Sequence, residues 1–316
     1  MNIVFTVCNR TQLPNALALG TSVLRYHPDF IFYIGWVDTA PLPVVPKGFK
    51  VLSAEELKIS EWGEMCARYY DFELVAASRP WFAKRILKNN PACSQLTFLS
   101  PTTMFFDSMQ EINDPETDLF LTPNINKPIT VPNHLDDKRI LNIGMFHSGS
   151  WILKPNKTTG KMLDWWAHRT IDRAKYDLCN GMCMDQLWLN YAPIWVEKTV
   201  QISHPGWHYG LHSILNKSLT ESNGSFLVEN EKLISIDFAG LMQFDPIWSD
   251  YAALANQNPV FKKLHKAYIE KVKTFDKTQP GKEPGYGIIP KISDQRLLRK
   301  NITGKLKAIT KFIDQY

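Results

Sequence analysis

Apolar and polar positions alternate with two different periods over the first hundred residues. A short apolar run over residues 1–7 predicts a buried strand, and residues 9–26 repeat apolar positions at helical spacing. Residues 29–37 predict a second strand, and residues 51–52 predict a short third strand. This alternation of strands with helices predicts an α/β fold, built on a mostly parallel sheet with helices on both faces.

The following segment continues this alternation. Ser53 and Glu56 have the spacing of a capping box, which predicts that a helix starts there. Residues 69–89 predict an amphipathic helix or a pair of helices interrupted at Pro80. The apolar run after it ends in the stretch SPTT at residues 100–103, which predicts a strand followed by a turn whose hydroxyls bond the backbone.

Ligands of parallel sheets collect where the strands end. We therefore expect one crevice at the carboxyl edge of the predicted sheet. Its expected members are Thr6, Val7, Cys8, Asp38, Ser100, Pro101, Thr102 and Thr103.

The second half of the chain mixes strands and helices less regularly. The expected elements are strands over residues 118–122, 143–153 and 233–238 and helices over residues 158–172 and 184–191. No internal repeat and no low-complexity linker interrupts the chain. We therefore expect one domain over residues 1–250, followed by a helical appendage over residues 251–316.

The composition is typical of a packed globular protein, because 44% of the 316 residues are hydrophobic and 12% are aromatic. The five cysteines are odd in number, and their spacing fits neither zinc knuckles nor a disulfide framework. The chain does not begin with the pattern of a secretory signal, and no apolar run is long enough to span a bilayer. We therefore expect a cytoplasmic protein.

The net charge of +5 resides in one segment. The first 290 residues carry 29 basic and 29 acidic side chains, whereas residues 291–316 carry seven basic and two acidic ones. The balanced body argues against nucleic-acid binding. The tail has the pattern of a basic amphipathic helix, weakened by Gly304. Two interpretations stay open, since such a helix can contact an anionic membrane surface peripherally or dock on its own domain.

A series of segments in register resembles a group of bacterial glycosyltransferases of the GT-A fold. The segments span residues 3–241 and include ELVAASRPWF, TFLSPTTMFF, DLFLTPN, LNIGMFHSGSWILKP, LDWWAHR, GMCMDQLWLN, ISHPGW and IDFAG. The resemblance implies a Rossmann-like sheet and a nucleoside-diphosphate sugar donor, expected to be a UDP-sugar. It also implies transfer to a saccharide or lipid-linked acceptor in bacterial polysaccharide biosynthesis.

Members of this group hold a divalent metal through a D-x-D motif, and the metal stabilises the leaving diphosphate. Here the two aspartates fall on Ser100 and Thr102, and the histidine of the group's FHFSG segment falls on Asp237. Hydroxyls are poor ligands for a hard divalent ion. We therefore expect no metal cofactor. Arg79, in the place of the group's lysine, would neutralise the diphosphate together with Arg10 and helix N-termini.

The resemblance also assigns roles around the sugar and the nucleoside. Asp185 is expected beside the reacting sugar as the catalytic residue, with Gln186 next to it; the alternative is an acid favoured by a helix N-terminus. Asn142 and Gly144 would form the acceptor-side wall, or alternatively a strand bulge. The expected nucleoside positions are Thr6, Val7, Cys8 and Asp38.

The segment HPGWH completes the expected acceptor side. Its members His204, Gly206, Trp207 and His208 would line the sugar or acceptor, although a tight turn with a packed tryptophan explains them equally well. A zinc site formed by the histidines at 204, 208 and 212 is not expected, because Pro205 and Gly206 prevent a single helical face.

Two functional hypotheses stay open at this point. The first is a glycosyltransferase that works without a metal. The second is a catalytically silent binding or scaffold protein on the same fold. A nucleotidyltransferase is less favoured, because the segment VCNRTQLPN after the first strand contains no glycine.

Overall fold

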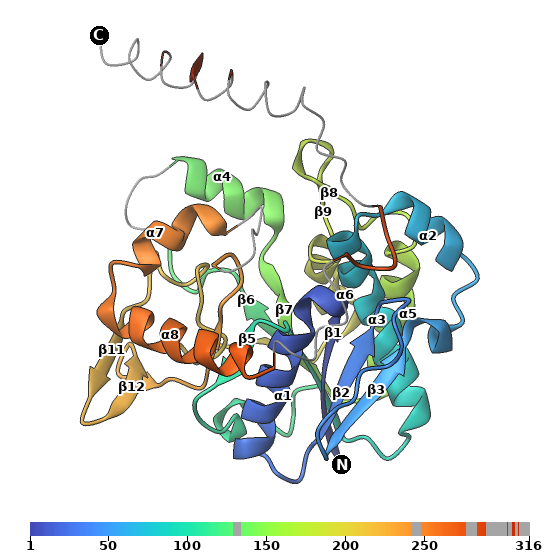
Figure 1. Ribbon diagram of the computed structural model, residues 1–316, viewed down its shortest axis with the longest axis horizontal. Helices are drawn as coiled ribbons and strands as arrows, with labels where there is room; N and C mark the ends of the chain where they lie inside the picture. Colours follow the sequence, from blue (N-terminus) through green and yellow to red (C-terminus); the bar gives the residue numbers. More distant parts are fainter. Residues whose placement is uncertain are drawn as a thin grey trace.

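The computed structural model describes residues 1–128, 134–241, 248–275 and 283–288, together with residues 302, 305, 306 and 309. Its centre is a seven-stranded sheet with the strand order β10-β6-β7-β4-β1-β2-β3 (Figure 1). The sheet is mostly parallel, because β7 is the strand that runs against its neighbours β4 and β6. The predicted α/β class is confirmed.

The strands of this sheet follow the apolar runs of the sequence. They are β1 (Asn2–Cys8), β2 (Ile31–Trp36), β3 (Phe49–Ser53), β4 (Gln95–Leu99), β6 (Leu119–Pro123), β7 (Phe146–Leu153) and β10 (Thr199–Gln201). The predicted strands over 1–7, 29–37, 51–52 and 118–122 are therefore confirmed to within a few residues. β10 was not predicted, because it is short, lies at the edge of the sheet and is largely exposed.

Helices cover both faces of the sheet. The helices of the described residues are α1 (Leu13–Tyr26), α2 (Trp62–Arg68), α3 (Asp71–Asn89), α4 (His134–Ile143), α5 (Lys157–Arg169), α6 (Ala192–Trp195), α7 (Ala252–Ala255) and α8 (Pro259–Lys273). Short 3-10 turns join several of these elements, among them η1 (Arg10–Gln12), η2 (Ala54–Leu57) and η5 (Leu187–Tyr191).

Strand β1 shows how the two faces are built. Ile3, Phe5 and Val7 belong to a buried cluster that includes side chains of α3 and α5. Val4 and Cys8 belong to a second cluster, which includes side chains of α1. Successive residues of a strand point to opposite faces, so one short apolar run contributes side chains to both hydrophobic clusters. The sheet is thereby packed against helices on both faces.

Two predicted boundaries were wrong at helix α3 and turn η2. Helix α3 runs through Pro80 without a break, because the proline is itself buried and the packing of the whole helix compensates for one missing hydrogen bond. Ser53 and Glu56 do form the predicted capping box, but they start the single 3-10 turn η2 and not a longer helix.

The strand expected over residues 143–153 was also wrong at its start. Residues 134–143 form α4, and Gly144 ends this helix with a φ of 90° and an N–H that donates to the carbonyl of Ile140. The strand itself begins at Phe146. Similarly, the helix expected over residues 184–191 is the turn η5, preceded by the short strand β9 (Met182–Cys183).

A second, two-stranded sheet lies beside the main one. Strand β5 (Thr103–Phe105) pairs antiparallel with β14 (Ser235–Asp237), so that Thr103 stands opposite Asp237. The late strand was predicted; its pairing with β5 was not, because the two strands are far apart in the sequence. The small strands β8 (Tyr176–Asp177), β11 (Leu219–Ser222), β12 (Ser225–Val228) and β13 (Glu231–Lys232) were not predicted.

The C-terminal helices pack on the rest of the protein. Helix α8 lies against α1, where Asn15 Nδ2 donates to the hydroxyl of Tyr268 at 2.6 Å (Figure 1). A domain boundary at residue 250 stays a prediction. The basic tail over residues 291–316 lies outside the described residues except at four positions. Among the residues that the structure describes, no helix has both the length and the apolar character needed to cross a membrane.

Candidate functional site

A crevice of about 450 Å³ opens where β4 and β14 end. Its lining residues come from η1, α3, the turn after β4, the β8–β9 hairpin and the chain after β14. They are Gln12, Asp71, Phe72, Val75, Arg79, Ser100, Pro101, Thr102, Tyr176, Met184, Phe238, Ala239 and Gly240. The structure thus brings the predicted donor residues Arg79, Ser100 and Thr102 together in one cavity.

The hydroxyls at the D-x-D position form a chain of hydrogen bonds. Ser100 Oγ lies 2.9 Å from Thr102 Oγ1, and Thr102 Oγ1 donates to Asp237 Oδ1. The β5–β14 pairing sets this contact, because Phe238 N–H donates to the carbonyl of Thr102 at 3.0 Å. The Ala239 N–H also donates to Asp237 Oδ1. One oxygen of this carboxylate is therefore fully engaged by protein donors.

The residues Ser100, Thr102 and Asp237 do not fit the divalent cation that GT-A enzymes usually hold there. They offer one carboxylate, whose Oδ1 already accepts from Thr102 and Ala239. Magnesium and calcium bind sites richer in carboxylate and carbonyl oxygens. We therefore derive no step of the chemistry from a metal at this position.

Arg79 reaches from α3 into the wall of the crevice. Its Nη1 donates to Asp185 Oδ1 at 3.0 Å and to Ser148 Oγ at 2.9 Å, and the guanidinium lies over the ring of Phe98. Its Nε is buried and has no hydrogen-bond partner among the described residues. The guanidinium is thus held in one orientation while part of its donor capacity stays unused.

Asp185 is fully buried behind Arg79. Its backbone carbonyl accepts from Trp166 Nε1 at 3.0 Å, which ties the segment before η5 to α5. Burial raises the pKa of Asp185 above its usual range, although Arg79 and Ser148 act in the opposite direction. A buried acid with a raised pKa next to a cavity is typical of functional sites.

Gln186 fastens the same segment to β7 and α4. Its Oε1 accepts from the Ser148 N–H at 3.0 Å, and its Nε2 donates to the carbonyl of Ile143 at 3.0 Å. Both ends of the amide are therefore used inside the protein. The DQ pair positions Ser148 and Arg79 from behind the crevice, and neither member lines it.

Arg10 and Asp38 pair with each other where β1 and β2 end. Arg10 Nε donates to Asp38 Oδ2 at 2.9 Å, Nη2 also contacts the carboxylate, and the backbone N–H groups of Arg10 and Ala40 donate to it at 3.0 Å. Burial opposes ionisation of Asp38, but these donors outweigh it and lower its pKa. The pair stands beside Gln12, which lines the crevice.

The side chains of Thr6, Val7 and Cys8 are fully buried in β1 and do not line the crevice. Val7 packs on the α3 side of the sheet and Cys8 on the α1 side. Burial also raises the pKa of the Cys8 thiol. Their contact with a nucleoside stays a prediction.

Asn142 and Gly144 lie at the end of α4 and not on a strand. A Cβ at position 144 would lie 2.8 Å from Asn190 Nδ2, so a side chain would clash there. The N–H of Met145 donates to Asn190 Oδ1. The alternative of a strand bulge is wrong, because Asn142 belongs to α4 and Gly144 follows its last residue. The acceptor-side role stays a prediction. The nearby strand residue that contacts a lining residue is Ser148 of β7, whose Oγ accepts from Arg79 Nη1 at 2.9 Å.

In the HPGWH segment, His204, Gly206 and Trp207 make contacts within the fold, and His208 lies apart from them beside Asp237. His204 bonds the surface acid Glu111, and Trp207 is buried with its Nε1 donating to Thr122 Oγ1. Gly206 is pressed against the backbone of Lys232, where a Cβ would lie 2.0 Å from the carbonyl oxygen. None of these three lines the crevice. His208 is buried beside Asp237.

The sequence interpretation missed His147 and Ser148. The signal was present in the run FHSG, where polar residues interrupt an otherwise apolar strand, and all its residues are buried. A buried polar side chain in a strand centre needs a partner. That partner came from segments far away in the sequence.

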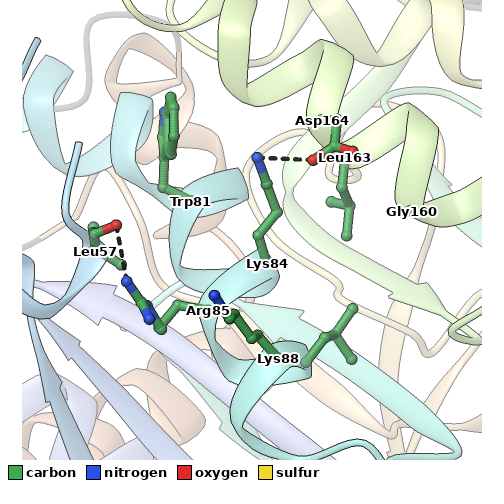
Figure 2. A pocket seen from close by; sticks show the side chains of 9 residues that line it. Leu57, Trp81, Lys84, Arg85, Lys88, Gly160, Leu163 and Asp164 are labelled. Atoms are coloured by element: carbon green, nitrogen blue, oxygen red, sulfur yellow. Dashed lines mark hydrogen bonds and ion pairs between the residues drawn. The ribbon is translucent and has the colours of Figure 1, made fainter. Parts of the chain in front are cut away.

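A second hollow of about 400 Å³ lies between α3 and α5, at the far end of α3 from the crevice (Figure 2). It is lined by Trp81, Lys84, Arg85 and Lys88 together with Asp164 and apolar side chains. Lys84 pairs with Asp164 at 2.8 Å, and Arg85 donates to the carbonyl of Leu57 (Figure 2). The charges of Lys84, Arg85 and Asp164 are used within the protein, so we place the functional site in the first crevice.

Comparison with solved structures shows the fold. The galactosyltransferase LgtC in complex with donor and acceptor sugar analogues is similar at a TM-score of 0.51 and 12% identity, over 92% of this chain and 98% of that chain. The mostly parallel α/β sheet with helices on both faces is therefore the GT-A fold, as predicted.

Two further structures are more distant. An active-site mutant of LgtC gives a TM-score of 0.47 at 12% identity, over 81% of this chain and 96% of that one. A glycosyltransferase involved in the glycosylation of the major capsid of PBCV-1 gives 0.44 at 8% identity, over 75% and 93%. No protein-family model and no curated protein matches the sequence.

Proposed function

We propose that this protein transfers a sugar from a nucleoside-diphosphate donor, a UDP-sugar, to a saccharide or lipid-linked acceptor. The observation that carries the proposal is the convergence of Arg79, Ser100 and Thr102 in one crevice at the strand ends of a GT-A fold. Such a crevice is where ligands of α/β sheets bind. Its volume of about 450 Å³ lies in the range of small-molecule sites.

The chemical requirement is to stabilise the diphosphate as the glycosidic bond breaks and its negative charge grows. Arg79 supplies a cation whose direction is already set by Asp185 and Ser148, so little reorganisation is needed when the donor binds. Guanidinium groups match phosphate oxygens in a bidentate way. The hydroxyl of Ser100 donates to Thr102 Oγ1 in this structure, because Thr102 donates to Asp237, and it adds a neutral donor to the diphosphate only by turning toward it.

Asp185 takes its predicted role through Arg79 in this proposal, because it does not line the crevice. It lies next to the group that would hold the diphosphate, on the side away from solvent. A carboxylate there fixes the orientation of Arg79 and stabilises from a distance the positive charge that develops at the anomeric carbon.

The proposal of a saccharide acceptor is supported by a similar structure. The similar LgtC structure holds donor and acceptor sugar analogues. Cytoplasmic location, bacterial polysaccharide assembly and peripheral membrane contact through residues 291–316 remain parts of the proposal that come from the sequence.

The proposal is tested by measuring UDP release from UDP-sugars with and without saccharide acceptors, in the presence and absence of Mg²⁺. We expect release that does not depend on Mg²⁺ and that falls about 10³-fold in Asp185→Asn. The matched control is Asp164→Asn, which removes an exposed carboxylate on the hollow of Figure 2 and should leave the rate unchanged.

The second candidate is a binding or scaffold protein without turnover. It is favoured by the change of all three metal-directed positions to Ser100, Thr102 and Asp237. Calorimetric binding of a UDP-sugar with no release toward any acceptor would support this candidate. Failure to bind any sugar nucleotide would exclude both.

A further inference from the structure

We propose that His147, His208 and Asp237 bind a divalent transition-metal ion in a buried site directly behind the crevice. The three side chains come from β7, from the loop before β11 and from β14. Their candidate ligand atoms all lie within 4.8 Å of one another. The site shares Asp237 with the three metal-directed positions, but its other two ligands are His147 and His208 instead of Ser100 and Thr102.

The distance between two of the three ligand atoms already suits coordination, whereas the set as a whole would have to draw together from within 4.8 Å. His208 Nε2 lies 3.4 Å from Asp237 Oδ2. Two ligands bound to one ion at about 2.1 Å in tetrahedral geometry stand about 3.4 Å apart. The same distance is too long for a good hydrogen bond between these groups. The carboxylate and the imidazole are therefore spaced for a shared ion better than for each other.

The ring of His208 is the strongest sign that a partner belongs here. It is fully buried, and among the described residues its Nδ1 has no hydrogen-bond partner and its Nε2 has only the long contact of 3.4 Å with Asp237 Oδ2. Buried polar atoms without a partner are rare and costly. His208 also adopts a left-handed backbone with a φ of 47°, a conformation that persists where the surrounding structure enforces it.

Gly149 keeps the space between the two imidazoles open. A Cβ at this position would lie 2.7 Å from His147 Nδ1 and 3.1 Å from His208 Nε2. The absent side chain would thus occupy the place where both nitrogens converge. The Gly149 N–H donates to His147 Nδ1, so this nitrogen is unprotonated, as a metal ligand must be. Coordination would exchange that local bond for the ion.

The ligand chemistry defines the class of ion. Two imidazoles and one carboxylate suit zinc, cobalt, manganese or iron, whereas magnesium prefers an all-oxygen site. The ring of His212 packs against His147 and His208 at centroid distances of 4.6 and 5.6 Å, and Trp248 stacks on His147. These rings close the site against solvent.

The ion would couple the buried site to the crevice. Asp237 uses Oδ2 toward His208 and Oδ1 toward Thr102, which lines the crevice. A metal on Oδ2 would hold the carboxylate, and through it the hydroxyl of Thr102, in place. The inference does not require the proposed glycosyl transfer, because metal binding is measured without any sugar nucleotide.

The experiment uses the full-length protein without a histidine tag. After exhaustive dialysis against a strong chelator, the protein is titrated calorimetrically with Zn²⁺ and with Mg²⁺, and Co²⁺ is added for an absorption spectrum. We expect one equivalent of Zn²⁺ to bind, Mg²⁺ not to compete, and Co²⁺ to give the ligand-field bands of an imidazole-bound ion. A Co²⁺ spectrum identical to that of the free aquo ion would overturn the proposal.

Variants locate the ion. His208→Gln and Asp237→Asn should each weaken Zn²⁺ binding at least 100-fold. The matched control is His204→Gln, four residues before His208 and bonded to surface Glu111, which should bind Zn²⁺ as the unaltered protein does. Unchanged Zn²⁺ affinity in folded His208→Gln would refute the site. If the variants do not fold, the Co²⁺ spectrum of the unaltered protein still decides.

Discussion

Two arginine–aspartate pairs in this protein have the same chemistry and opposite electrostatics. In both pairs the carboxylate side chain is completely buried and its arginine is mostly covered. The pKa of Asp38, paired with Arg10, is lowered, whereas the pKa of Asp185, paired with Arg79, is raised. In each case burial is the largest influence and favours the neutral acid. Asp185 lies deeper in the protein than Asp38, so burial acts more strongly on its pKa, and the donors around each carboxylate add to the difference.

The donors of the two carboxylates also differ. Asp38 accepts from two backbone N–H groups and from two nitrogens of Arg10, where two parallel strands end. Asp185 accepts from a single nitrogen of Arg79, which is shared with Ser148, and the Ser148 hydroxyl and the backbone N–H of Asp185 also favour its ionised form. The donors of Asp38 outweigh its burial, whereas those of Asp185 do not. A buried acid with a raised pKa beside a cavity is typical of functional sites.

The largest effect should come from breaking the second pair. Arg79→Met leaves the carboxylate of Asp185 buried without a cation, so we expect the free energy of unfolding at pH 7 to fall by about 3–5 kcal/mol. Burial raises the pKa of Asp185, so the folded state holds its proton longer than the unfolded state. The variant should therefore lose stability as pH rises above the unfolded value of about 3.9. Urea denaturation at a series of pH values measures the loss at pH 7 and its dependence on pH.

A double variant checks the cause of that loss. Arg79→Met combined with Asp185→Leu removes both charges and fills the space with apolar atoms, and it should recover most of the lost stability. If the double variant is as unstable as Arg79→Met alone, lost packing over Phe98 and not the unpaired carboxylate explains the effect.

A smaller effect is expected at the pair of Arg10 and Asp38. Arg10→Gln removes the charged donor but leaves the two backbone donors of Asp38, so we expect a loss of about 1.5–3 kcal/mol at pH 7. The pKa of Asp38 is lowered in the folded protein, so its contribution is complete above the unfolded value of about 3.9 and is lost as pH falls through the folded pKa. The difference between variant and unaltered protein should shrink in acid. A difference that does not change with pH would contradict this.

The smallest effect should come from an exposed pair. Lys84 and Asp164 meet at 2.8 Å at the edge of the second hollow, with 33% and 67% of their side chains exposed (Figure 2). Lys84→Ala should change the free energy of unfolding by about 0–1 kcal/mol, and 1 M salt should abolish the difference. A loss comparable to that of Arg10→Gln would show that burial does not determine which ion pair contributes more to the free energy of unfolding.

The local part of this site followed from the sequence. Asp38 directly follows a buried strand, and Ser100 and Thr102 follow another, so their place at the carboxyl edge was predictable from strand periodicity and parallel order. Arg79 came from the resemblance. The capping box at Ser53 was also predictable, because it depends on residues three apart.

The partners of these residues did not follow from the sequence. Arg79 and Asp185 are 106 positions apart, and Thr102 and Asp237 are 135 apart. Nothing in the local pattern of Gly144 distinguished a helix end from a strand, so the strand was extended too far. His147 was passed over although polar residues interrupt the apolar run FHSG, because its neighbours His208 and Asp237 are distant in the sequence.

The order of apolar runs and turn residues thus determined the sheet, its helices and the edge at which a ligand binds, because these depend on periods of two and 3.6 residues that a linear chain displays. Only the tertiary structure decided that Asp185 shares its one arginine nitrogen, that Asp237 faces His208, and that Gly149 leaves room between two imidazoles. Charge, burial and hydrogen bonding act over a few ångströms in space, and distance along the chain does not report them.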